Sequence, residues 1–293
     1  MSESRDFLVE VGTEELPPKS LLDLAQAFAD GIARGLEAAG VAHKAVERFA
    51  TPRRLAVRVR RVVEQQPDRA VERRGPPLAT SFDAQGAPTQ AALAFARSRG
   101  IGVAALERLE TPKGAWLVHR GVEPGARTID LLPGIVQAAL DALPVARRMR
   151  WGAGEAEFVR PVHWLLMLYG REVVACSLLG VPAGNLSYGH RFMAPRALRI
   201  SSPAGYVQAL HRRGRVLVDI HERRETIRQA VAAAAAQVGG EAAIDESLLD
   251  EVTALVEWPG AIEGRFEERF LELPREVLLS TLQEHQRYFA VED

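Results

Sequence analysis

Hydrophobic residues alternate with polar ones near the start of the chain and then recur at helical spacing. Phe7, Val9 and Val11 fall on one side of an extended segment, which predicts a strand there. From about Lys19 to Ala39 the apolar residues recur every three to four positions, which predicts an amphipathic helix that ends at the following glycine. The chain therefore opens with a strand and a helix that share one apolar core.

The same patterns predict the elements along the rest of the chain. Helices are expected at residues 89–99, 128–143, 202–213, 222–238, 245–257 and 274–288, strands at 46–49, 55–63, 158–169, 172–179 and 216–220, and a hairpin at 106–122. The strands neither dominate nor alternate regularly with helices. This favours an α+β fold with mixed, mostly antiparallel sheets, packed amphipathic helices and at least two domains.

Two stretches of unusual composition divide the chain. Residues 65–88 are rich in Pro, Gly, Gln and charge, which is typical of a long connection or an inserted arm. Pro144 and the arginines that follow it place the main boundary near residue 145. We therefore expect one α+β domain over residues 1–145, which carries the basic arm, and a second over residues 146–293, which ends in helices.

The composition is that of a soluble globular protein. The 293 residues are 47% hydrophobic, enough to bury a sizeable core, and the net charge is −1. No run of about eighteen apolar residues occurs, and MSESRDF lacks the basic end and apolar stretch of a secretory signal. The single cysteine, Cys176, excludes an internal disulfide framework. We therefore expect a cytoplasmic protein with no membrane partner.

Charge is distributed unevenly along the chain. Residues 44–74 hold ten basic and four acidic residues, a net of +6, whereas residues 241–293 hold four basic and fourteen acidic residues, a net of −10. Apolar residues alternate with Arg54, Arg58 and Arg60, which predicts a half-buried strand with a cationic outer face. This asymmetry is compatible with a polyanion at the basic region and a protein partner or solvent at the acidic one.

No catalytic signature occurs in the sequence. The chain lacks the motifs GxxxxGK[ST], GxGxxG, HExxH and GxSxG. The pairs His221-Glu222 and Glu284-His285 have no second histidine at ligand spacing. We therefore expect neither a catalytic centre nor a metal site within the chain.

Clusters of arginine favour nucleic-acid contact instead. Arginine pairs with phosphate, and its planar guanidinium stacks on exposed bases. Trp151, Trp164, Tyr188 and Phe192 lie among the later clusters. Alternatively, Trp164 is a core residue and Arg160 forms a surface salt bridge with Glu155 or Glu157. The candidate contacts are Arg53, Arg54, Arg73, Arg74, Arg147, Arg148, Arg150, Arg160, His190 and Arg191.

The acidic C-terminal third has two interpretations. Its helices carry solvated acidic faces, or its aromatic and arginine residues contact the rest of the polypeptide or a partner subunit. The candidate contacts of this second kind are Trp258, His285, Arg287, Tyr288 and Phe289.

Seven short motifs occur in order along the chain. They are GTEELP at residues 12–17, ATPRRLAVRV at 50–59, RMRWG at 148–152, FVRPVHW at 158–164, GHRF at 189–192, EWP at 257–259 and QEHQRYF at 283–289. Over about Asp6 to Phe289, these motifs and their order resemble the amino-terminal part of one family, the beta subunit of the bacterial heterotetrameric glycyl-tRNA synthetase.

This resemblance implies a non-catalytic, tRNA-binding and subunit-interacting part of glycine-tRNA ligase. Its partners are then glycine tRNA and the alpha subunit, in an alpha2beta2 assembly. The resemblance implies that the alpha subunit makes glycyl-adenylate and binds ATP and Mg, with no cofactor in this chain. It also implies that the chain is a fragment that stops before the family's HD-type and helical anticodon-binding domains. Positively charged loops would orient the 3′ end of the tRNA toward the partner's active site.

Two other functions remain open at this point. One is an aminoacyl-ester hydrolase of the editing type, in which His163, His190 and a carboxylate such as Glu157 act as acid and base. The other is a scaffold that binds the alpha subunit without binding tRNA.

Overall fold

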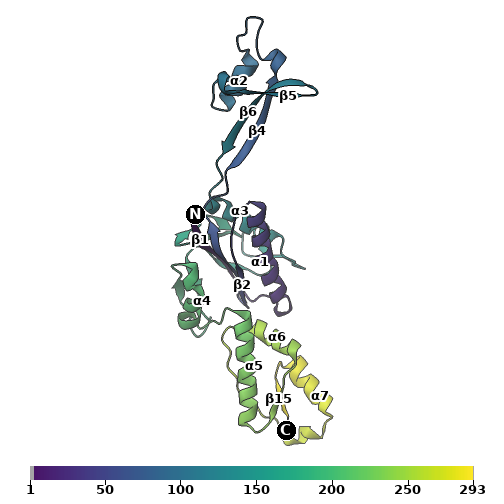
Figure 1. Ribbon diagram of the computed structural model, residues 1–293. Coiled ribbons are helices and arrows are strands. Elements are labelled where there is room, and N and C mark those ends of the chain that lie inside the picture. Colours follow the sequence, from purple (N-terminus) through teal and green to yellow (C-terminus); the bar gives the residue numbers. More distant parts are fainter. Residues whose placement is uncertain (1–2, 293) are drawn as a thin grey trace. The chain divides into compact units, whose positions relative to one another are not determined.

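The computed structural model describes residues 3–292, which divide into two compact units (Figure 1). Unit 1 contains the chain up to Glu64 and again from Thr128 onward, and unit 2 is the intervening segment Gln65–Arg127. The expected boundary near residue 145 is therefore wrong. Strand β9 (Val162–Tyr169), which lies beyond that boundary, pairs with the N-terminal strand β1 (Ser4–Thr13), so the segments before and after residue 145 share one sheet.

Unit 1 contains most of the regular structure. Its strands are β1 (Ser4–Thr13), β2 (Val46–Thr51), β3 (Arg54–Val63), β7 (Met149–Arg150), β8 (Glu157–Phe158), β9 (Val162–Tyr169), β10 (Glu172–Val173), β11 (Ser177–Leu178), β12 (Val181–Gly184), β13 (Leu186–Tyr188), β14 (Ala197–Arg199), β15 (Glu241–Ala243) and β16 (Ala290–Glu292). Its helices are α1 (Leu21–Ala38), α3 (Thr128–Asp141), α4 (Tyr206–Ala209), α5 (Ile220–Gln237), α6 (Glu246–Leu255) and α7 (Arg275–Ser280). Short 3-10 turns occupy Pro18–Ser20, Pro203–Gly205 and Glu268–Glu272, and π-helical turns occupy Leu210–Gly214 and Thr281–His285.

A seven-stranded sheet forms the centre of unit 1. The strand order is β11-β12-β9-β1-β3-β2, and β10 also pairs with β9. Strand β1 pairs antiparallel with β3 on one side and with β9 on the other, so Gly12 lies opposite both Arg54 and Trp164. The β12–β9 pair is parallel, whereas the other pairs in this sheet are antiparallel. The predicted α+β fold is confirmed.

One face of the sheet packs against α1 and α3. The apolar stripe predicted for α1 is confirmed, because its buried residues are Leu21, Leu24, Ala25, Phe28, Ala29, Ile32 and Leu36. They meet Val9, Val11 and Val57 from the sheet in one core. Such burial removes apolar surface from water and is the main source of stability for these elements.

The opposite face is covered by a second core. Leu8, Leu166 and Leu168 of the sheet pack there against Tyr206 and Val216. The prediction of an exposed cationic face on β3 is therefore wrong, because chain segments after β12 cover that face. Arg54 and Arg58 are buried, and each is paired with a carboxylate.

Several segments differ from their predicted structure. The strand expected at 158–169 is divided between β8 and β9, and the strand expected at 172–179 is divided between β10 and β11. The helix expected at 274–288 consists of α7 and a π-helical turn. Residues 216–220 do not form a strand, because no neighbouring strand accepts their backbone hydrogen bonds. The Val216 amide donates to the Leu210 carbonyl, and the Leu217 amide donates to the Glu257 carbonyl. The helix predicted at 202–213 is a composite of a 3-10 turn, α4 and a π-helical turn. The segment 65–88, expected to be a long connection or an inserted arm, belongs to the inserted unit 2 and contains the nine-residue strand β4 (Arg69–Pro77).

Unit 2 is a small sheet with one helix. Its elements are β4 (Arg69–Pro77), a 3-10 turn (Leu78–Thr80), α2 (Gln90–Ser98), a 3-10 turn (Val103–Ala105), β5 (Glu107–Thr111) and β6 (Gly114–Glu123). The strands are antiparallel in the order β4-β6-β5. The predicted hairpin turn at Lys113-Gly114 is confirmed, with Gly114 at a φ of 118°.

The C-terminal part of unit 1 is capped locally but exposes much apolar surface. Asp219 and Asp245 accept hydrogen bonds from the first turns of α5 and α6, as N-cap residues do. From residue 261 to residue 289, however, no residue is buried. Among residues 3–292, no helix is long and apolar enough to cross a lipid bilayer.

Unit 2 can be removed without opening unit 1, because the two chain ends that lead to it meet. The Thr128 amide donates to the Glu64 carbonyl at 2.8 Å, and its hydroxyl donates to the Val63 carbonyl at 2.6 Å. We expect replacement of Gln65–Arg127 by a short Gly-Ser linker to change the Tm of unit 1 by less than about 5 °C, since a shorter loop costs little entropy to close. Thermal unfolding followed by circular dichroism tests this. Loss of the cooperative transition would contradict it.

Candidate nucleic-acid interface

The sequence motifs converge at the end of β1. The amide of Thr13, the last residue of β1, donates to the Arg53 carbonyl in the loop before β3 at 2.9 Å. The amide of Glu14, in the loop after β1, donates to the Pro161 carbonyl in the loop before β9 at 3.0 Å. Gly12 has no space for a side chain because the Trp164 ring lies over it. Three motifs that are far apart in sequence are therefore neighbours in the fold.

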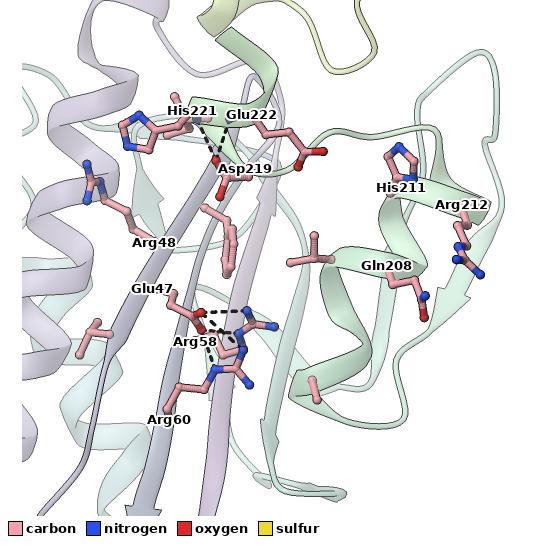
Figure 2. Close-up of a pocket in the computed structure, with 15 residues that line it drawn as sticks. Glu47, Arg48, Arg58, Arg60, Gln208, His211, Arg212, Asp219, His221 and Glu222 are labelled. Atoms are coloured by element: carbon pink, nitrogen blue, oxygen red, sulfur yellow. Dashed lines mark hydrogen bonds and ion pairs between the residues drawn. The ribbon is translucent and has the colours of Figure 1, made fainter. Parts of the chain in front are cut away.

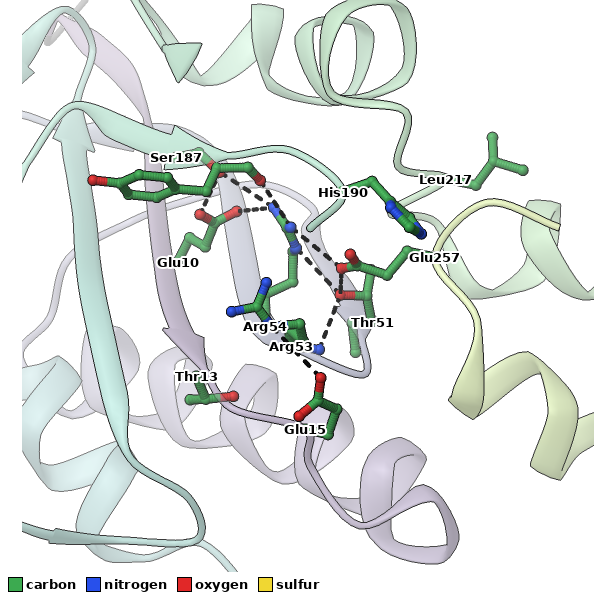
Figure 3. A network of polar contacts seen from close by, with 12 residues as sticks. Glu10, Thr13, Glu15, Thr51, Arg53, Arg54, Ser187, His190, Leu217 and Glu257 are labelled. Carbon is green, nitrogen blue, oxygen red and sulfur yellow. Dashed lines mark hydrogen bonds and ion pairs between the residues drawn. The ribbon is translucent and has the colours of Figure 1, made fainter. Parts of the chain in front are cut away.

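Beneath these loops lies a buried polar network, drawn in Figure 3, with Arg54 at its centre. The Arg54 guanidinium donates to Glu10 at 3.4 Å, to Glu257 at 3.2 Å and to the Tyr188 carbonyl at 2.9 Å. It also donates to the hydroxyls of Thr51 and Ser187, each at 3.2 Å. A buried guanidinium with all of its nitrogens engaged has no donor left for a ligand.

Glu10 is the second hub of this network. It accepts hydrogen bonds from Ser187 at 2.6 Å, from the Trp164 indole and from the Tyr206 hydroxyl. Burial, together with the adjacent Glu10 charge, raises the pKa of Tyr206 well above its ordinary value. Burial acts to lower the pKa of Arg54, but the charges of Glu257 and Glu10 outweigh it and raise that pKa. Arg54 therefore stays positively charged, and Tyr206 stays a neutral donor.

A second buried arginine, Arg223 of α5, joins the C-terminal helices to the sheet. It donates to the carbonyls of Thr253 at 3.0 Å, Leu217 at 2.5 Å and Ala50 at 2.9 Å. Burial lowers its pKa to about 10, which leaves it charged at neutral pH. The positive charges of Arg54 and Arg223 thus balance the negative charges of Glu10 and Glu257 in and around the network.

At the surface next to this network lies an ion cluster, which consists of Glu14, Glu15, Arg53, His163 and Arg191. Glu14 lies 2.8 Å from the His163 ring and 2.6 Å from Arg191, which also reaches Glu15 at 3.0 Å. Arg53 is 3.9 Å from Glu15. Burial acts to raise the pKa of Glu14, but hydrogen bonds from His163 and Arg191 outweigh it and lower that pKa.

The structure separates the candidate contacts into different environments. Arg54 is wrong as a nucleic-acid contact, because it is fully buried and satisfied. Arg53 and Arg191 lie in the ion cluster, and Arg160 donates to the Glu15 carbonyl at 2.9 Å. The last contact replaces the salt bridge to Glu155 or Glu157 that the sequence left open.

The other candidates lie elsewhere in the chain. Arg147 is exposed and has no polar partner among residues 3–292, whereas Arg148 donates to carbonyls at the C-terminal end of α3, at 2.8 and 3.1 Å. Arg150 forms surface ion pairs with Glu155 and Glu157. In unit 2, Arg73 pairs with Glu123 at 3.1 Å, and Arg74 stacks over the Trp116 ring, 3.5 Å from its centroid.

The structure also reveals a basic surface that was missed in the sequence. Residues 173–218 contain six arginines and two histidines but no aspartate or glutamate, and this absence of acids was the signal that could have identified it. The arginine face, as we call it, consists of Arg196, Arg199, Arg212, Arg213 and Arg215, all exposed. None of them forms an ion pair with any residue that the structure describes.

Contacts between β14 and the π-helical turn bring these arginines together. Leu198 of β14 packs against Gly214, and Arg213 donates to the Arg199 carbonyl at 3.4 Å. Arg215 lies over the Trp258 ring, 5.3 Å from its centroid. Trp258, a candidate for subunit or interdomain contact, therefore makes an intramolecular contact at the edge of the arginine face.

A pocket of about 680 Å³ adjoins the arginine face at Arg212 (Figure 2). Inside it, Glu47 accepts hydrogen bonds from Arg58 at 2.5 Å and from Arg60 at 2.9 Å. Burial acts to raise the pKa of Glu47, but these hydrogen bonds outweigh it and lower that pKa. Arg48 lines the pocket with no polar partner among residues 3–292. The pocket is lined by both acidic and basic side chains, so it is less suited to a polyanion than the arginine face is.

The remaining candidates for subunit or interdomain contact lie in the weakly packed C-terminal segment. Arg287 pairs with Glu251 at 2.9 Å, His285 and Tyr288 are exposed, and Phe289 is half-buried. In the part of the chain that the structure describes, no group of three or more His, Cys, Asp or Glu side chains is arranged to hold a metal ion.

Loss of the Arg54 charge is expected to destabilise unit 1 strongly. Arg54→Met leaves Glu10 and Glu257 buried without their shared partner, which costs roughly 3–5 kcal/mol of unfolding free energy. The neighbouring variant Arg53→Met removes a long, partly exposed ion pair with Glu15 and a distant contact with the Trp164 ring, and it should cost less than about 1 kcal/mol. Urea unfolding of both variants measures this difference. Equal effects would contradict the role assigned to Arg54.

Glu14 is expected to make the free energy of unfolding depend on pH in the acidic range. Because its pKa is lower in the folded protein than the ordinary 4.5, its contribution is present above that pH and is lost as the pH falls through the lower folded pKa. Glu14→Gln should therefore lose less stability than the unmodified chain when the pH falls from about 5 to about 3. Urea midpoints measured across this range test the expectation, and parallel pH profiles would contradict it.

Comparison with known proteins identifies the family. A family model described as "Glycyl-tRNA synthetase beta subunit" matches residues 7–293. Curated proteins named "Glycine--tRNA ligase beta subunit" are 55% identical in Marinobacter nauticus and 54% identical in Hahella chejuensis, over 99% of this chain but 42% of each relative. A relative of that name in Azotobacter vinelandii is 52% identical over the same shares. The chain spans about two fifths of the length of these relatives. The chain therefore belongs to the glycyl-tRNA synthetase beta subunit family.

Proposed function

We propose that this chain is the tRNA-binding and subunit-interacting part of a glycine-tRNA ligase. In this role it positions tRNA for transfer of glycine from glycyl-adenylate, which the alpha subunit makes from glycine and ATP with Mg. The relatives of this chain carry the name of that ligase's beta subunit. The partner subunit would supply the chemistry and the ATP site, and this chain would supply orientation.

The arginine face is the observation that carries the tRNA-binding half of the proposal. Exposed guanidinium groups usually pair with nearby carboxylates, as Arg69, Arg73 and Arg120 do in unit 2. The arginine face has no such partners among residues 3–292, so its charge remains available for phosphate. Phosphate contacts of this kind supply most of the sequence-independent affinity for RNA and fix its orientation.

Two of the original candidates can supplement this face without loss of an ion pair. His190 lies in the same acid-free stretch of the chain, and Arg147 is exposed and unpaired within residues 3–292. Arg73, Arg150 and Arg191 would have to exchange a carboxylate partner for phosphate, which reduces the gain from binding. Arg74 already stacks on an aromatic ring. The arginine face is therefore proposed as the main contact, and His190 and Arg147 as its supplements.

The subunit-interacting half of the proposal rests on the C-terminal segment. Residues 255–291 expose many large apolar side chains, among them Ile262 at 95% and Leu271 at 64% of the full exposure of the residue. Exposed apolar patches of this kind are typical of surfaces that another polypeptide covers. His285, Tyr288 and Phe289 lie in this segment, so it is the proposed contact for the alpha subunit or for the rest of the beta polypeptide.

The hydrolase alternative finds no matching geometry. His163 is held by Glu14, Glu157 pairs with Arg150, and the His190 ring accepts backbone hydrogen bonds. No hydrogen bond joins these three residues within the described part of the chain. We therefore do not propose it. The scaffold alternative is decided by the binding experiment that follows.

Binding of glycine tRNA is expected to depend steeply on salt. Log affinity falls as log salt rises. Replacing Arg196, Arg199 and Arg212 together by Ala should make this slope less steep by about 2 to 3, since each phosphate contact contributes roughly 0.7 to 0.9 to its magnitude. The matched control replaces Arg69, Arg73 and Arg120, which are already paired with carboxylates and should change the slope by less than about 1. Fluorescence anisotropy at several salt concentrations measures the slopes.

Two results would contradict the proposal. The first is an equal change of slope in both triple variants, which would mean that the arginine face has no special role. The second is binding of the alpha subunit without any binding of tRNA, which would make the chain an assembly scaffold. An unrelated tRNA of the same length, measured in parallel, shows whether the contact discriminates between tRNAs.

A further inference from the structure

A tightly anchored turn beside the arginine face holds an aromatic side chain out into solvent. Phe192 has 82% of its full exposure and Met193 has 57%. Both lie in the turn His190–Ala194, which connects β13 to β14. An exposed phenylalanine next to an exposed methionine is not explained by the packing of this unit.

The His190 side chain is what holds this turn in place. Its Nδ1 accepts the backbone N–H groups of both Phe192 and Met193, each at 3.2 Å. The His190 amide donates to the Gly214 carbonyl at 2.7 Å, and the Ala194 amide donates to the His190 carbonyl at 3.0 Å. Gly189, just before the turn, lies against the backbone of Ala194 and Gly214 with no space for a side chain. The turn therefore presents Phe192 in a defined place instead of letting it fold back onto the core.

The charge around the turn restricts what can bind to it. The turn lies within the stretch 173–218, which lacks any acidic residue, and Arg196 of the arginine face is the second residue after it. Glu14 and Glu15, which reach this turn at Arg191, are already paired with that arginine. An apolar group in a basic setting is complementary to a ligand that has a flat apolar face and a negative charge close by. Each nucleotide of RNA has both.

We infer that Phe192 is a stacking site for an unpaired base of bound RNA, with the neighbouring phosphates held by the arginine face. This inference rests on the proposed function and adds the structural class of the nucleotide. Single-stranded bases expose faces that aromatic side chains can cover, whereas bases inside a duplex do not. His190 is then a positioning residue, since it acts through the turn that carries Phe192.

The alternative occupant is a protein surface with an apolar hollow. Such a partner would have to bring its own carboxylates to match the arginines, whereas RNA carries a phosphate at every nucleotide. The charge pattern therefore favours RNA, and binding of the alpha subunit serves as the readout for the other case.

The test compares two RNA probes that differ only in unpaired nucleotides. One is a blunt duplex, and the other is the same duplex with a single-stranded overhang that carries 2-aminopurine, whose fluorescence falls when it stacks. We expect the purified chain to bind the overhang probe about 5- to 150-fold more tightly than the blunt one, the range that stacking of a single base provides. Phe192→Ala should abolish this preference and the fluorescence decrease while leaving the salt slope unchanged. Phe192→Trp should retain both.

A matched control separates this site from general apolar contact. Phe266→Ala also removes an exposed phenylalanine, but one from the acidic C-terminal segment, and it should leave the preference for the overhang intact. If Phe192→Ala keeps the preference, or loses alpha-subunit binding in its place, the inference is overturned while the proposed function stands. If the unmodified chain shows no salt-dependent binding to either probe or to tRNA, the proposed function itself fails.

Discussion

The buried charge of Arg54 is the interaction on which the arrangement of unit 1 depends. A guanidinium inside a sheet is stable only if carboxylates and carbonyls satisfy it, and here Glu10 comes from the central strand while Glu257 follows α6. Loss of any one of these three groups leaves a buried charge without its partner. The C-terminal helices are therefore joined to the N-terminal sheet by electrostatics, and Arg223 reinforces the same connection through backbone carbonyls.

Arginines in this chain fall into two groups with different physical roles. Those that cross-link elements are buried or paired, as Arg54 and Arg58 are, because an unpaired charge in the interior is strongly unfavourable. Those of the arginine face are exposed and have no carboxylate partner among residues 3–292. Pairing, and not abundance, thus separates structural arginines from those available to a polyanion. Unit 2, rich in arginine but also in acidic partners, shows why counting basic residues is not sufficient.

The two functional surfaces proposed for this chain differ in charge and in chemistry. The arginine face and the turn with Phe192 combine positive charge with an aromatic platform, which suits RNA. The segment 255–291 combines exposed apolar residues with acidic ones, which suits contact with polypeptide. The buried network attaches the elements that carry these two surfaces to the same sheet. A ligand at either surface therefore contacts elements that are anchored to that sheet.

The sequence by itself indicated the main elements of the sheet and its first helix, and the family resemblance. Period-two and helical spacing located β1, β3 and α1, because the residues at these periods share the core between the sheet and α1. It could not show that β9 pairs with β1, or that residues 65–127 form a separate unit, because pairing between distant segments leaves no local pattern. Only the tertiary structure decided which arginines are free. Arg54 and Arg196 look alike in sequence, and what distinguishes them is a carboxylate that the fold brings to one and not to the other, Glu257 being 203 residues from Arg54.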